Sequence, residues 1–147
     1  MNNNLYQKLY DSFCKYKKNN FLKTSNQENY SYNEVIIKTN LYSTVLKELG
    51  LKKGQRLLIQ TNKNIETIWI YLATLKLGAI YVPINVSYTS SELEYFINDS
   101  EPSIFVTDNF DKIKDTISKF KKICIYDINK KDSKLESSFN KTEVKIA

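Results

Sequence analysis

Residues that commonly carry catalysis are scarce in this sequence. It contains no histidine, which excludes histidine triads, histidine metal sites and acid–base catalysis by imidazole. Its two cysteines, Cys14 and Cys124, are too few for a zinc site or a disulfide framework. Three glycines, at 50, 54 and 78, cannot build a glycine-rich phosphate loop. The sequence therefore nominates no catalytic, cofactor-binding or metal-binding residue.

Polar residues do follow each of four apolar runs. They are Gln60-Thr61-Asn62, Ile84-Asn85, Thr107-Asp108 and Tyr126-Asp127. In parallel α/β sheets, ligands bind beyond the carboxyl ends of the strands, so these residues could line a crevice. The same residue types are equally typical of turns and helix caps. Without a glycine-rich first turn, the pattern does not favour a dinucleotide site.

The charge of the chain raises the question of a nucleic-acid partner. The formal charge is +6, and residues 109–147 carry most of the excess, with 10 basic and 6 acidic side chains. Only one of the 22 basic residues, Arg56, is an arginine, the residue that most often reads bases and clamps phosphates. An ordinary solvated surface is the favoured interpretation, and no nucleic-acid partner is expected.

The compartment can be predicted from what the sequence lacks. The N-terminus has no apolar core of signal-peptide length. The most apolar stretch, 65–86, is interrupted by Glu66, Lys76, Gly78 and Pro83, so no membrane span is expected. Two apparently unpaired cysteines are typical of a reducing interior. We expect a cytoplasmic protein.

The elements that would position these residues alternate between strand and helix. A helix is predicted over 5–16, followed by short strands at 21–24 and 28–31. Further helices are predicted between Ser31 and Gly50, between Asn64 and Gly78, from Thr89 to Ser100, and over 110–120. Buried strands are predicted at 56–60, 80–84, 103–107 and 123–126. Ser31 and Glu34, like Thr89 and Glu92, have the spacing of a capping box, which satisfies amides at a helix start.

This alternation predicts an α/β fold, with a parallel, doubly wound sheet layer and flanking helices. We expect residues 1–128 to form this subdomain. Residues 129–147 are polar and basic, and we interpret them as a linker or tail with at most one strand, at 144–146, leading toward a missing subdomain.

Three ordered motifs over about eighty residues resemble the N-terminal region of the adenylate-forming superfamily. This superfamily includes acyl-CoA synthetases, peptide-synthetase adenylation domains and luciferases. The motifs are SYNEV with its helix ending LKELGLKKGQRL, then YLATLKLGAIYVPIN, then YTSSELEYFINDSEPSIFVTD. They are similar to the superfamily's TYxEL…LGVxxGDRV, ALKAGAAYVPLN and xxxxRLxYILxDSxAxxLVTD. The resemblance implies that the predicted sheet is the incomplete N-terminal subdomain of that fold.

Two details favour one subgroup. Asn85 stands where peptide-synthetase domains usually have aspartate, which favours acyl-CoA synthetases. The run YVPINVSYTSSELEYFINDSEPSIFV is similar to malonyl-CoA synthetases. The resemblance implies an ATP-dependent acid–CoA ligase that forms an acyl-adenylate and then an acyl-CoA, with malonate as the favoured acid.

The same resemblance shows what the chain lacks. The superfamily uses a Ser/Thr/Gly-rich phosphate loop with Mg²⁺, a ribose-binding aspartate and a lysine in a mobile C-terminal domain, and none of these motifs occurs here. ATP, Mg²⁺ and CoA are thus implied for the full-length enzyme and not for this chain. We expect a catalytically inactive fragment whose partners are the following subdomain and the mobile domain. A standalone α/β binding or regulatory module that retains the first lobe is the alternative.

Overall fold

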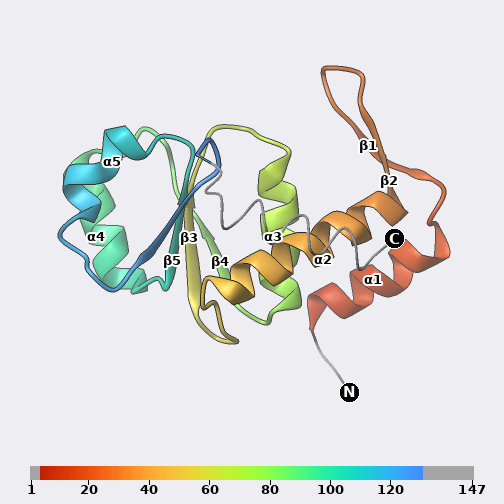
Figure 1. Ribbon diagram of the computed structural model, residues 1–147, viewed down its shortest axis with the longest axis horizontal. Coiled ribbons are helices and arrows are strands. Elements are labelled where there is room, and N and C mark those ends of the chain that lie inside the picture. Colours follow the sequence, from red (N-terminus) through yellow and green to blue (C-terminus); the bar gives the residue numbers. More distant parts are fainter. Residues whose placement is uncertain (1–3, 131–147) are drawn as a thin grey trace.

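The structure is a computed structural model that describes residues 4–130. Eleven elements occur there, in an order that alternates between strand and helix from β3 onward (Figure 1). The helices are α1 (Leu5–Lys15), α2 (Tyr32–Glu48), α3 (Glu66–Lys76), α4 (Ser90–Ser100) and α5 (Phe110–Ile117). The strands are β1 (Asn20–Lys23), β2 (Asn29–Ser31), β3 (Arg56–Gln60), β4 (Ile80–Pro83), β5 (Ile104–Thr107) and β6 (Cys124–Asp127).

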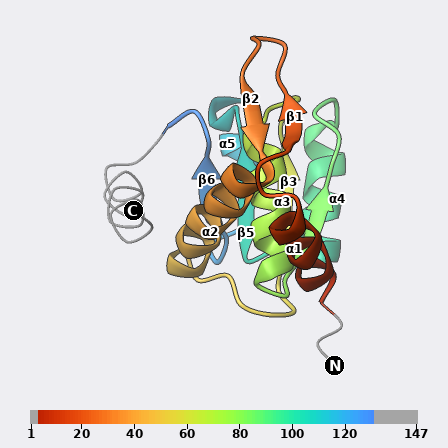
Figure 2. The same ribbon diagram turned by 90° about the vertical axis from the view of Figure 1, so that its right-hand side faces the viewer.

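The strands β3 to β6 form one parallel sheet in the order β4-β3-β5-β6. The chain starts this sheet at β3, adds β4 on one side, and then crosses to the other side for β5 and β6. The predicted parallel α/β layer is therefore confirmed, and the strand order changes direction between β3 and β5. The strands β1 and β2 form a separate antiparallel hairpin that projects from the α1–α2 side (Figures 1 and 2).

Helices cover both faces of the sheet, as expected for a doubly wound layer. In Figures 1 and 2, α1, α2 and α3 lie on one side of the strands and α4 and α5 on the other. Successive residues of β3 point to opposite faces, so each face has its own core. Leu57 belongs to the larger core under α1–α3, and Leu58 to a smaller one with Phe105, Leu93 and Ile113 under α4 and α5.

Both predicted capping boxes are present. The Ser31 hydroxyl accepts a hydrogen bond from the Glu34 amide, and the Glu34 carboxylate accepts one from the Ser31 amide at 2.7 Å. Thr89 and Glu92 make the same reciprocal pair at the start of α4. These bonds satisfy amides that have no partner within the helix, so the starts of α2 and α4 are determined locally.

Several predicted boundaries were wrong by one to three residues. The largest error concerns α5, predicted over 110–120, which ends at Ile117. The amides of Lys119 and Phe120 bond the carbonyls of Thr116 and Ile117, which is a tight turn and not a further helical turn. Phe120 still packs on the smaller core, which explains its helical spacing in the sequence. The predicted boundary at residue 128 stays a prediction, and the possible strand at 144–146 lies outside the described residues.

Candidate functional site at the carboxyl edge of the sheet

Loops at the carboxyl ends of the strands meet at the point where the strand order reverses. A crevice of about 290 Å³ lies there, beyond β3 and β5. Four of the predicted strand-end residues line it, namely Gln60, Asn62, Thr107 and Asp108. This is the position at which open α/β sheets bind ligands.

Hydrogen bonds tie these loops to one another. The Asp108 carboxylate accepts two bonds through Oδ2, from the backbone amide and the side-chain amide of Asn62, at 2.8 and 2.9 Å. Asn129 donates from its side chain to the Asp108 carbonyl at 2.5 Å. These bonds hold the loops after β3, β5 and β6 together. Asn62 and Asp108 are 46 residues apart in the sequence.

The loop after β4 closes the other side of the crevice. Gln60 donates from Nε2 to the Asn85 carbonyl at 2.8 Å. Lys112, in the first turn of α5, donates from Nζ to the Val86 carbonyl at 2.7 Å. Lys112 was not predicted as a site residue. The only sequence feature that could have indicated a place in the site is its position, because the first turn of a helix that follows a strand lies at the carboxyl edge of the sheet.

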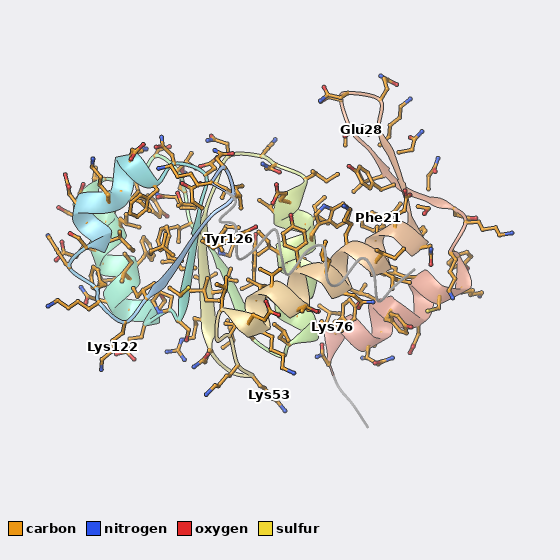
Figure 3. All side chains as sticks on the ribbon, viewed as in Figure 1. Phe21, Glu28, Lys53, Lys76, Lys122 and Tyr126 are labelled. Atoms are coloured by element: carbon orange, nitrogen blue, oxygen red, sulfur yellow. The ribbon has the colours of Figure 1, made fainter. Side chains whose placement is uncertain are left out.

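The other five predicted residues are not among those that line the crevice, namely Thr61, Ile84, Asn85, Tyr126 and Asp127. Asp127 accepts the Asn129 amide at 2.9 Å and shapes a turn. Tyr126 points into the larger core, where its side chain is 1% exposed and its hydroxyl has no hydrogen-bond partner among the described residues. Figure 3 shows this side chain between the sheet and the helices.

A second polar cluster lies beside Tyr126, inside the larger core. Tyr42, from α2, donates from its hydroxyl to Oε2 of Glu66 at the start of α3, at 2.5 Å. Burial is the largest cause that raises the pKa of both Tyr42 and Tyr126, and the nearby Glu66 carboxylate raises both further. Both phenols therefore stay protonated at neutral pH, and the Tyr42–Glu66 hydrogen bond joins α2 to α3.

The crevice does not fit a nucleoside triphosphate or its magnesium ion. Its one carboxylate already accepts two hydrogen bonds, and its one ammonium group already donates to a carbonyl. Within residues 4–130, no group of three or more acidic, histidine or cysteine side chains could hold a metal ion. These hydrogen bonds therefore hold the loops of the crevice in place. In the same part of the chain, no helix combines the length and apolar character that crossing a membrane requires.

Comparison with known proteins identifies this architecture. MatB from Rhodopseudomonas palustris, solved with ATP bound, superposes with a TM-score of 0.81 at 32% sequence identity. The superposition covers 95% of this chain and 28% of MatB. The parallel sheet with its flanking helices is thus the N-terminal subdomain of the adenylate-forming fold.

The sequence comparisons agree with the structural one. Residues 12–146 match the AMP-binding enzyme family, and the chain belongs to that family. YtcI of Bacillus subtilis, an uncharacterized acyl-CoA ligase, is 35% identical over 75 residues, which are 51% of this chain and 14% of YtcI. Gramicidin S synthase 1 of Brevibacillus brevis is 28% identical over 99 residues, which are 67% of this chain and 9% of the synthase. The chain therefore spans a small part of the length of each relative, and the resemblance predicted from its motifs is confirmed.

Proposed function

We propose that this chain is the first lobe of an ATP-dependent acid–CoA ligase, with malonate as the favoured acid. The observation that carries the proposal is the likeness to MatB over 95% of the chain. The motif run from Tyr81 to Val106, with Asn85 in place of the aspartate usual in peptide synthetases, supports a CoA ligase over a peptide synthetase.

In this proposal the lobe contributes scaffold and interface, and other parts of the enzyme contribute the chemistry. The residues at the carboxyl edge bond to each other and do not form a phosphate site. ATP, Mg²⁺ and CoA would be bound by the following subdomain and the mobile domain. The isolated chain should therefore be inactive.

Exchange of ATP with pyrophosphate tests the inactivity directly. Purified chain, incubated with ATP, Mg²⁺ and malonate, should produce no exchange above a blank, and R. palustris MatB serves as the positive control. Exchange that copurifies with the chain through two chromatographic steps would overturn the proposal that the chemistry lies elsewhere.

A chimera tests the scaffold role. Residues 4–130 would replace the superposed segment of MatB, and the chimera should retain malonate-dependent exchange. The matched control carries Leu58→Asp, which places a charge in the smaller core and should abolish exchange by unfolding the lobe. A chimera that is folded by circular dichroism and still lacks exchange would contradict the proposal.

Malonate requires a separate test, because residues outside this chain would select the acid. The reading frame that follows the gene would be expressed in fusion with it, and exchange would be compared for malonate, methylmalonate, acetate and a set of amino acids. Malonate should give the highest kcat/KM. A preference for an amino acid would instead place the protein among the peptide-synthetase adenylation domains.

A further inference from the structure

A second cavity lies at the amino edge of the sheet, opposite the crevice. It measures about 700 Å³ and is bounded by the ends of α2 and α4 and by the turn that leads into β6. Ile97, Phe120 and Ile123 give it an apolar wall. Cavities between about 300 and 1,000 Å³ hold small organic ligands. Figure 3 shows Lys122 at this lower edge of the molecule, away from the carboxyl-edge loops.

Hydrogen-bond donors without partners surround the apolar wall. Lys121 and Lys122 line the cavity, and neither has an ion pair or a side-chain hydrogen bond within residues 4–130. The side-chain amide of Asn98 and the hydroxyl of Ser103 line it too, and in the same residues neither makes a hydrogen bond. The cavity thus combines an apolar surface with two positive charges, two neutral donors and the carboxylate of Glu101.

Negative groups at this edge are already compensated. The carbonyls of Ser100 and Glu101, at the end of α4, accept hydrogen bonds from the Arg56 guanidinium at 2.6 and 3.2 Å. The Glu101 carboxylate lies 3.9 Å from the same guanidinium. The C-termini of α2 and α4 each carry about half a negative charge, so with Glu101 they amount to about two negative charges against the three positive charges of Arg56, Lys121 and Lys122. The field in the cavity therefore favours an anion.

We propose that this cavity binds an amphipathic carboxylate, with the carboxylate at Lys121 and Lys122 and the hydrocarbon part against Ile97, Phe120 and Ile123. A single carboxylate satisfies the two ammonium groups, and a hydrocarbon tail covers the half-buried side chains of Phe120 and Ile123, under which Ile97 is 2% exposed. This site does not depend on the proposed ligase function, because every residue involved belongs to this chain.

Cys124 provides a built-in reporter of occupancy. Cys124 is among the residues that line the cavity, and its half-buried side chain packs against the larger core, whereas Ile123 packs against the smaller one. Burial raises the pKa of the thiol above its usual value, so labelling is done at a mildly alkaline pH. In the full chain carrying Cys14→Ser, octanoate should slow the alkylation of Cys124 by iodoacetamide in a saturable manner. In the full chain carrying Cys124→Ser, alkylation of Cys14 should not change with octanoate, which controls for general effects of the fatty acid.

The series of straight-chain acids tests the apolar wall. Each methylene buried is worth about 0.8 kcal/mol, so each added carbon from butanoate to octanoate should lower the half-protecting concentration about two- to fourfold. Inorganic phosphate and acetate should protect weakly. Equal protection by phosphate, acetate and octanoate would overturn the proposal, because the apolar wall would then contribute nothing.

A pair of double variants tests the two lysines. Lys121→Gln with Lys122→Gln should weaken octanoate protection about tenfold, since two exposed ion pairs are lost. Lys17→Gln with Lys18→Gln removes the same charge from an exposed pair after α1 and should leave protection unchanged. Equal weakening by both pairs, or no protection of Cys124 at any octanoate concentration below micelle formation, would refute the site.

Discussion

Removing the hydroxyl of Tyr126 should make the protein more stable. Tyr126 lies in β6 with its side chain 1% exposed, and its hydroxyl has no hydrogen-bond partner within the described residues. A buried hydroxyl without a partner costs about 1–3 kcal/mol of folding free energy. Tyr126→Phe keeps the ring and its packing while it removes that cost. We expect a gain of about 1 kcal/mol, which raises the Tm of a chain of this size by about 3 °C.

Tyr42→Phe is the matched control, because the same atom is removed from another buried tyrosine. The Tyr42 hydroxyl donates to the Glu66 carboxylate at 2.5 Å. Hydrogen bonds to charged groups are worth about 1.5–3 kcal/mol, and the variant also leaves the carboxylate short of a donor. We expect a loss of about 2 kcal/mol. The two substitutions should therefore move the stability in opposite directions.

Urea unfolding measures both variants. Trp69 is the only tryptophan and is 3% exposed, so its fluorescence reports the larger core, to which Tyr126 also belongs. The slope of free energy against urea should stay constant, so that midpoints compare directly. A Tyr126→Phe protein that loses 1 kcal/mol or more would refute the reasoning, because its hydroxyl would then have a stabilising partner.

Three further outcomes follow from the contacts. Burial raises the pKa of Tyr6 to about 12. The contribution of this side chain to the free energy of unfolding is therefore complete below about pH 10, the pKa of tyrosine in the unfolded chain, and is lost as the pH rises from there toward 12. Tyr6→Phe should flatten the decline of the urea midpoint between these two pH values. Asp108→Ala should cost about 1 kcal/mol and speed amide hydrogen exchange in the loop after β3, whereas Asp111→Ala, at an exposed ion pair, should do neither. Thr89→Ala should lower the free energy of unfolding by about 1 kcal/mol through loss of the α4 cap, and Ser90→Ala, one residue later, by much less.

Features that depend on neighbouring residues could be predicted from the sequence. The capping boxes at Ser31 and Thr89 are examples, because each involves residues only three positions apart. Gly78 is another. A helix was predicted to end at Gly78; α3 ends at Lys76, and Gly78 has a φ of +69°, a conformation that favours glycine. The alternation of strand and helix in turn predicted the parallel sheet, because parallel strands require crossovers.

The hydrogen bonds between loops at the carboxyl edge of the sheet could not be predicted from the sequence. Asn62 and Asp108 read equally well as turn residues, and nothing in either segment indicates that the two bond to each other. Lys112 resembled any other surface lysine, although its ammonium reaches a carbonyl 26 positions away. Such contacts depend on strand order, and the crossing of β5 to the far side of β3 is a property of the assembled sheet.

That strand order also determines when each face of β3 can be covered while the chain is being synthesised. Leu57 and Leu58 leave the ribosome together, but they belong to different cores. The face of β3 that carries Leu57 belongs to the larger core, to which the earlier helix α2 also contributes. The face that carries Leu58 must wait for Leu93 and Phe105, and at roughly 5–20 residues per second the first of these arrives about 2–7 seconds later. During this interval the nascent chain presents an uncovered apolar strand, so a ribosome-associated chaperone would find its binding segment at residues 56–60.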